Sequence, residues 1–353
     1  MTLQLYLFRQ IALSTLFAVG ALGFIVFPAV AVSAVQKLGA AGLMAVLSYL
    51  PLVGIEIAPY LLSLGFLLAV VTTFGRLAAD REWVAIQMSG LHPAWMVLPG
   101  LVVAGLLGGA TWYAVSTVSP AWKLEQGNFR ANVLTEAFRN LAPGRTEIDL
   151  GRFYVAAAAR DGTAFVDAQI RIPKESGDDL TLVADRVEIS FTDTELVVLL
   201  ANARAVEQGD DFRIGLPTVR IPLDQIFTRS TRDLRRAKYN TSGALVEGLR
   251  AGSVPEQFRV EWVLEVHERY AMGATFVVFL LVGIPTGLWL RSGAQLTGLG
   301  FAALYAFAYF ILSLQVGEGL ARNGVLSPAL APWTTNILGG AFGLVFLWRS
   351  AAR

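Results

Sequence analysis

Cysteine is absent from this 353-residue chain, and only two histidines are present. Without cysteine there can be no disulfide, no thiolate metal site and no cysteine nucleophile. The sequence also has no G-x-x-x-x-G-K-[ST] loop to hold nucleotide phosphates. Its net charge of +1 is too small to create a positive electrostatic field that would attract nucleic acid. We therefore expect no metal, no bound cofactor and no nucleic-acid partner, and any ATP would have to be used by another subunit.

Charge is scarce in both flanks of the chain. Residues 121–260 hold 19 of the 28 Lys and Arg and 20 of the 27 Asp and Glu, and 55% of all residues are hydrophobic. Such apolar flanks are typical of membrane proteins. The sequence predicts an α-helical membrane protein with an inserted β domain, divided into 1–120, 121–260 and 261–353.

Six segments are long and apolar enough to span a bilayer, which takes roughly 20 helical residues. They are about 10–34, 56–75, 95–118, 270–290, 296–316 and 331–348. The first is too long for a signal-peptide core and is interpreted as a retained helix. A further uncharged stretch, 38–55, contains Gly39, Gly42, Pro51 and Gly54, and we interpret it as a short interfacial helix. The prediction is three spans on each side of the insert.

The basic residues of the short loops predict the orientation, because Lys and Arg stay on the cytoplasmic side. With six spans, Lys37 and Arg322 lie on one face of the membrane, and most of the basic residues lie on the other face. The residues on that other face are Arg9, Arg76, Arg81, Arg291, Arg349 and Arg353. Both termini are then cytoplasmic, and the insert lies outside the cytoplasm.

The insert contains alternating polar and apolar residues, most regularly over 185–191 and less so over 212–216. Turn clusters at 160–162, 175–179 and 209–211 separate such segments. This pattern predicts an antiparallel, sandwich or jelly-roll-like sheet over about 145–228. Residues 121–142 are expected to be helical or extended, and 229–255 to form a basic connector.

The loop between spans two and three carries the most specific pattern. Leu77, Val84, Met88 and Leu91 recur at helical spacing, Glu82 falls on roughly the opposite side, and Gly90 with Pro93 ends the helix. A short helix lying flat under the membrane fits this pattern. Its charges either merely hold it at the interface or form a docking surface that transmits force to a cytoplasmic partner.

In this loop and in overall layout, the chain resembles the paired F and G permease subunits of the lipopolysaccharide transport (Lpt) ABC exporter of Gram-negative bacteria. The sharpest matching motif runs from Glu82 to Ser89-Gly90-Leu91. Weaker matches slightly favour the F type: Glu56, Glu265, Arg269, Pro285, Asn323-Gly324, Pro328, Trp333 and Asn336.

The resemblance implies a permease subunit without enzymatic activity in the inner membrane, paired with a second subunit of the family. A coupling helix over about 76–91 would dock on a cytoplasmic, LptB-like ATPase dimer through Glu82, flanked by Arg76, Asp80, Arg81 and His92. Spans one and five would line lateral gates for lipopolysaccharide. The jelly-roll-like insert would stack with LptC-like and LptA-like proteins to form a bridge towards the outer membrane.

Several residues outside this loop are further candidates. Lys37 and Glu56 lie near the outer side, where Lys37 could meet lipid phosphates or simply snorkel to the interface. Glu56 could pair with a partner's basic residue or be a plain interfacial carboxylate. Glu265 precedes Arg269 by four residues, the favourable order for a helical ion pair, and predicts a juxtamembrane brace. A metal site at His267 and Glu268 is unfavourable, because adjacent helical residues point apart.

Two sets of residues suggest contacts with other molecules. A basic cluster in the connector is either solvated or attracted to anionic head groups: Arg229, Arg232, Arg235, Arg236 and Lys238. Glycines of the membrane helices would suit an interface between two permease subunits: Gly100, Gly105, Gly108, Gly109, Gly298 and Gly300. The alternative functions are a secondary transporter or channel, disfavoured by the nearly uncharged spans, and a membrane-anchored assembly protein.

Overall fold

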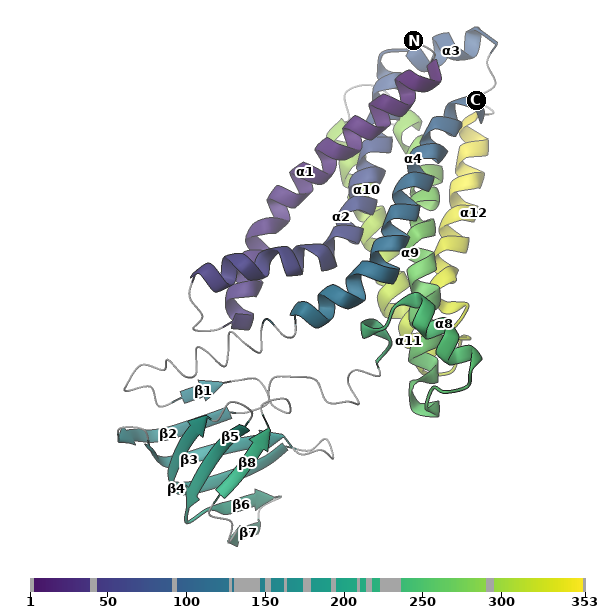
Figure 1. Cartoon of the computed structure of the whole chain (residues 1–353). Coiled ribbons are helices and arrows are strands. Elements are labelled where there is room, and N and C mark those ends of the chain that lie inside the picture. Colours follow the sequence, from purple (N-terminus) through teal and green to yellow (C-terminus); the bar gives the residue numbers. More distant parts are fainter. Residues whose placement is uncertain are drawn as a thin grey trace. The chain divides into compact units, whose positions relative to one another are not determined.

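The computed structural model describes most of the membrane flanks and parts of the insert (Figure 1). The described residues are 3–38, 43–90, 94–126, 129, 147–149, 154–161, 164–173, 179–191, 195–207, 210–213, 218–222, 236–289 and 295–351. The chain forms two compact units, and each is described by itself. The helical unit comprises Met1–Val32, Pro51–Lys123 and Arg235–Arg353, and the second unit comprises Ser33–Leu50 and Leu124–Leu234.

Long apolar helices make up the flanks of the chain. The first flank contains α1 (Leu3–Leu38), α2 (Leu43–Ala79), α3 (Glu82–Met88), α4 (Ala94–Tyr113) and the π-helical turn η1 (Ala114–Val118). The second contains the 3₁₀ turn η2 (Ala237–Tyr239), α8 (Ser242–Arg250), α9 (Glu256–Trp289), α10 (Gln295–Phe310), the π-helical η3 (Ile311–Gly317), α11 (Glu318–Arg322) and α12 (Ala331–Ala351).

Among the described residues, five helices are long and apolar enough to cross a membrane. They are Leu3–Gln36, Leu43–Ala79, Trp95–Gln126, Glu256–Trp289 and Gly300–Arg322. The sixth predicted span falls on α12, and its crossing of the membrane stays a prediction.

Residues 43–55 do not form a helix of their own, and their interfacial position stays a prediction. Residues 43–55 continue without a break into the second predicted span as α2, although Pro51 and Pro59 lie inside that helix. Proline and glycine are tolerated in membrane helices because neighbouring groups satisfy the freed backbone atoms. Proline therefore did not end this helix, as it usually does in water-soluble proteins.

Helix α9 runs through the middle of the helical unit, between α4 and α12 (Figure 1). Glycines let its neighbours approach closely. A Cβ on Gly287 would lie 2.6 Å from the backbone oxygen of Val71 on α2, and one on Gly108 of α4 would lie 2.4 Å from the oxygen of Gly273. On α12, a Cβ on Gly343 would meet Leu281 at 2.9 Å. Small residues at such contacts bring membrane helices together through close van der Waals packing.

These contacts correct part of the expected glycine interface. Gly108 faces α9 within the chain, as does Gly100, whose Cβ would meet Leu280. Gly105, Gly109 and Gly300 have open space where a Cβ would be. Of the six predicted glycines, these three leave room for another subunit to approach, while Gly298 is buried.

The second unit contains one antiparallel sheet. Its strands are β1 (Glu147–Asp149), β2 (Tyr154–Asp161), β3 (Ala164–Pro173), β4 (Asp179–Phe191), β5 (Glu195–Ala201), β6 (Arg204–Glu207), β7 (Asp210–Arg213) and β8 (Thr218–Pro222). They pair in the order β1-β2-β3-β4-β5-β8, while β6 pairs with β4 and β7. The predicted strand over 185–191 lies in β4, and β7 covers the first part of the predicted strand over 212–216; residues 214–217 lie outside the described residues.

The sheet turns a corner along a row of three polar residues. Asp167 of β3, Asp185 of β4 and Asn202, between β5 and β6, follow one another across the sheet, and Asp167 and Asn202 have φ of 50° and 54°. On each strand, the buried residues nearest to this row on its two sides are three positions apart, where a regular strand would have two. These pairs are Phe165 and Ala168, Val187 and Ala184, and Leu200 and Ala203. Asp and Asn tolerate the left-handed conformation that such a corner requires.

Candidate functional site

The predicted coupling helix is shorter than expected. Helix α2 continues to Ala79, so Arg76 belongs to the last turn of α2, and α3 covers only Glu82–Met88. Between them, Arg81 adopts a left-handed conformation with φ of 59°. Ser89 and Gly90 end α3 in a turn, and Leu91 and His92 lie outside the described residues. The helix about 76–91 is thus two helices joined by a sharp turn at Asp80 and Arg81.

Helix α3 has one buried residue and an exposed apolar side. Trp83 is buried and packs edge to face on Phe74 of α2, with ring centroids 6.3 Å apart. Val84 and Met88, which share the predicted apolar spacing, are 46% and 83% exposed, and the position of α3 flat under the membrane stays a prediction. The predicted spacing also included Leu77. Leu77 lies on α2, and the left-handed turn at Arg81 separates α2 from α3, so Leu77 and the α3 residues do not share one continuous helix. The anchor is therefore Trp83, and Val84 and Met88 face outwards.

A tyrosine of α1 links the two charged residues of this region. The hydroxyl of Tyr6 donates to Glu82 Oε2 and accepts from Arg76 Nη2, each at 3.5 Å. Glu82 and Arg76 are thereby brought to one place by three different helices. Sequence reasoning missed Tyr6, because it lies 70 residues before Arg76 and belongs to an apolar span.

The outer side of α3 combines charge with apolar surface. Asp80, Arg81, Glu82, Val84, Met88 and Ser89 are all exposed, and we call this set the α3 surface. At the same end of the helical unit lie the N-terminus of α1 and the C-terminus of α12 (Figure 1). Exposed apolar side chains rimmed by charges mark sites of interaction with another protein or with a membrane, so the α3 surface is a candidate site for either.

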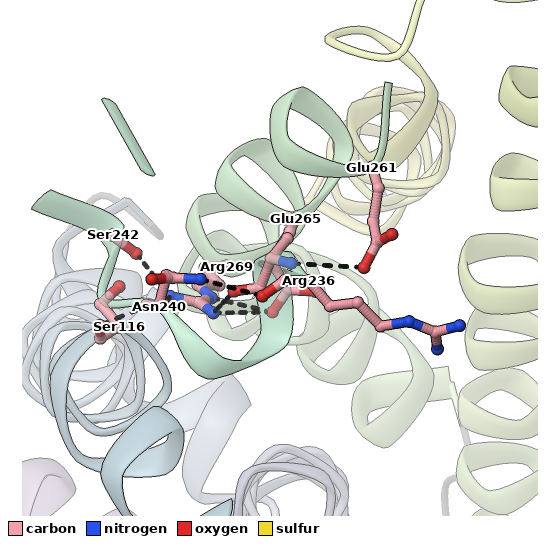
Figure 2. A network of polar contacts seen from close by, with 8 residues as sticks. Ser116, Arg236, Asn240, Ser242, Glu261, Glu265 and Arg269 are labelled. Carbon is pink, nitrogen blue, oxygen red and sulfur yellow. Dashed lines mark hydrogen bonds and ion pairs between the residues drawn. The ribbon is translucent and has the colours of Figure 1, made fainter. Parts of the chain in front are cut away.

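A second polar site lies at the other end of the helical unit and centres on Arg269 of α9 (Figure 2). Arg269 is only 2% exposed and pairs with Glu265 at 2.9 Å, so the expected helical ion pair is present. The guanidinium also donates to Asn240 O at 2.9 Å, to Ala237 O and Ser242 Oγ at 3.2 Å, and to Ser116 O at 3.5 Å. These partners come from η2, from the start of α8 and from η1.

The segment held by Arg269 is itself fixed by other contacts. Thr241 caps α8 by accepting a hydrogen bond from Ala244 N, and Glu261 Oε1 accepts one from Ala237 N. Leu245 is fully buried against Val266 of α9 and its neighbours. Ser116, Asn240 and Ser242 carry no motif, so nothing in the sequence could have assigned them to Arg269.

The remaining candidates are less closely connected. Glu56 is exposed on α2, and the side chain of Lys37 lies outside the described residues. In the basic cluster, Arg229, Arg232 and Arg235 lie outside them too, while Lys238 sits over the ring of Tyr239 at 5.2 Å. His267 accepts a hydrogen bond from Trp333 Nε1 at 3.3 Å. Within the described parts of the chain, no group of three or more acidic or histidine side chains is placed to hold a metal ion.

Comparison with protein families decides what these helices and surfaces belong to. The family model of the lipopolysaccharide export system permease LptF/LptG matches residues 5–349, nearly the whole chain. The chain belongs to the LptF/LptG family. No curated protein matches the sequence.

Membership of the LptF/LptG family assigns a transport role. Permeases of this family are subunits of the lipopolysaccharide transport complex and are not enzymes. Together with the five apolar helices, the family places the chain in the inner membrane as a multi-pass protein. The α3 surface and the Arg269 network are thus features of a lipopolysaccharide export permease.

Proposed function

We propose that this chain is one transmembrane half of an ABC exporter for lipopolysaccharide, and that a dimeric cytoplasmic ATPase docks on the α3 surface. The observation that carries this proposal is that α3 is anchored by one buried residue and exposes charged and apolar residues. Trp83 holds the helix on α2, while Val84 and Met88 are exposed and Glu82, also exposed, contacts Tyr6 of α1. A helix that is fixed on one side and apolar and charged on the other is suited to passing the ATPase's movement into the membrane helices.

The orientation of the helices follows from the basic residues near α3. Arg9, Arg76, Arg81 and Arg349 belong to helix segments that lie at the α3 end of the helical unit. By the positive-inside rule, this end is cytoplasmic. Both termini are then cytoplasmic, α12 is the sixth span, and the insert is periplasmic.

In this proposal, the lipid passes between the helices whose side chains are least buried within the chain. Of the candidate spans, Leu3–Gln36 and Gly300–Arg322 bury the smallest share of their apolar windows. We assign them to the two lateral gates, each facing the second permease subunit. Lys37 and Glu56 are assigned to the outer mouth of the path, where lipid phosphates pass.

Lipopolysaccharide then moves onto the insert and towards LptC-like and LptA-like proteins. The insert is jelly-roll-like in this proposal, because its strands turn a corner together and its buried face is apolar. Val155, Phe165, Ile170, Val187 and Val198 line that face. Sheet edges at β1, β7 and β8 are suited to strand addition by a neighbouring β domain.

Glu82→Lys and Met88→Asp test the docking of the ATPase. Both side chains are exposed, and the hydrogen bond from Tyr6 to Glu82 is long at 3.5 Å. Membrane insertion should therefore not change and the melting temperature should change little, while ATPase co-purification and lipopolysaccharide release should fall. Glu256→Lys is the matched control, because Glu256 is an exposed acidic residue in the first turn of α9. Normal ATPase recovery with both α3 variants would reject the docking site.

Photo-crosslinking tests the path over the insert. A photoreactive phenylalanine at Phe165, on the buried apolar face, should capture lipopolysaccharide only in the presence of ATP. The same residue at Leu199, which is 40% exposed on the opposite face of β5, serves as the control. Equal capture at both positions, or capture at neither, would contradict a path along the apolar face.

A further inference from the structure

Arg269 makes more contacts than an ion pair within one helix needs. The same i, i+4 arrangement occurs in α11, where Glu318 and Arg322 pair at 2.5 Å while Arg322 stays 60% exposed. Arg269 is instead 2% exposed, and four of its acceptors belong to other segments. Burying a charge is costly unless it is fully hydrogen-bonded. The network therefore serves to join segments and not merely to stabilise α9.

The segments joined by Arg269 have a specific place in the chain. Residues 236–250 follow closely after the second unit, which ends at Leu234, and we call them the return connector. Ser116 lies in η1, near the end of the helix that leads into the insert. One guanidinium thus holds the chain just before and just after the inserted domain. Because three of its acceptors are backbone oxygens, it fixes the main chain of both segments.

Helix α9 also supports α3 at its other end. Gly287 contacts α2 beside Phe74, and Phe74 in turn packs on Trp83 of α3. Gly287 and Arg269 are 18 residues apart on one helix, about 27 Å at 1.5 Å per residue. A single helix therefore carries the support of the α3 surface at one end and the return connector at the other.

We propose that Arg269 is a positioning residue for transport, which clamps both chain segments flanking the insert to α9, so that the insert's attachment moves with this helix. This proposal rests on the proposed function, since it names how a movement at α3 reaches the periplasmic domain. It assigns no contact with lipid to Arg269.

Distance measurements test the clamp directly. The chain has no cysteine, so Ala121→Cys and Glu247→Cys place two spin labels at exposed positions, on the helix following η1 and on α8. In the full complex in lipid nanodiscs, we expect one narrow distance distribution for the otherwise unchanged chain. Arg269→Met should broaden it, Arg269→Lys should partly restore it, and Arg322→Met, the matched control, should leave it narrow.

Transport measurements test the role of the clamp. With the complex in vesicles, Arg269→Met should lower the lipopolysaccharide delivered per ATP hydrolysed about fivefold or more, while ATP hydrolysis continues. An unchanged distance distribution in Arg269→Met would overturn the clamp. A broadened distribution with unchanged delivery per ATP would overturn its role in transport. If the unaltered complex delivers no lipopolysaccharide, the proposed function itself fails and takes the transport role of Arg269 with it, while the distances still decide whether the clamp exists.

Discussion

The indole of Trp83 packs edge to face against the ring of Phe74, with centroids 6.3 Å apart and planes at 67°. Phe74 is fully buried, and Trp83 is 7% exposed. Aromatic pairs in this geometry contribute about 0.5–1.5 kcal/mol beyond the burial of their surface. A helix of seven residues cannot persist alone in water, so this contact holds α3 in shape and place.

Trp83→Ala should release α3 from α2. Removing a buried tryptophan typically costs about 3–5 kcal/mol, and much of that loss should appear as local opening of α3. Faster hydrogen exchange of the α3 amides would show it, together with ATP hydrolysis that no longer drives lipopolysaccharide release. Val84→Ala alters an exposed side chain of the same helix and should leave its exchange rate unchanged; equal protection in both variants would contradict the anchoring role.

Removing one partner of the buried ion pair should destabilise the helical unit. Arg269→Met leaves Glu265 without its cation and four acceptors without their donor, and breaking a buried pair in this way costs about 3–5 kcal/mol. Arg322→Met breaks an exposed pair, which typically contributes about 0–1 kcal/mol. Thermal unfolding in detergent should separate the two variants clearly. Similar melting temperatures would mean that the network adds nothing to stability.

Enlarging Gly287 should force α2 and α9 apart. The nearest atoms to an added Cβ are backbone atoms, Val71 O at 2.6 Å and Gly75 N at 2.9 Å, which cannot rotate away. Gly287→Ala should therefore destabilise the protein by about 1–3 kcal/mol. Gly105→Ala meets open space and should stabilise α4 slightly, by up to about 1 kcal/mol. Melting temperatures that shift in the same direction would argue against the close contact.

The corner of the sheet should depend on Asn202. Its left-handed backbone costs a β-branched residue about 1–2 kcal/mol, and Asn202→Val also loses the hydrogen bond from Nδ2 to Asp185 Oδ2 at 2.9 Å. Limited proteolysis of the insert in the full chain should therefore accelerate. Leu199→Val, on the same strand before the corner, is the control, and equal cleavage rates would show that the corner does not require Asn202.

The sequence predicts what depends on local pattern. Long uncharged runs indicate the membrane helices, the alternation over 185–191 indicates β4, and the spacing of Glu265 and Arg269 indicates their ion pair. It also predicts a helix in the loop that contains Glu82. These features need only the neighbouring residues, and the structure contains each of them.

Features that depend on distant contacts could not be predicted in this way. The continuity of α2 through Pro51 is a property of membrane helices supported by neighbours. Which residues of α3 are exposed depends on Arg81, whose left-handed conformation separates α2 from α3. The spacing of apolar residues in the sequence does not reveal this interruption. Tyr6, Ser116 and Asn240 acquire their roles only when remote segments meet.

The glycine contacts of α9 hold three neighbouring helices against it. Helices α2, α4 and α12 touch α9 nearly backbone to backbone, so a slide of one turn would drive side chains into main chain. Helix α1 is also approached closely on its inner side, because a Cβ on Gly65 of α2 would lie 3.1 Å from the backbone nitrogen of Val19. The outward faces of α1 and α10 carry the exposed side chains Phe17, Phe24 and Phe307. Under the proposed function, the space between two permease subunits would open at these exposed outward faces, while the glycine contacts around α9 keep α2, α4 and α12 together.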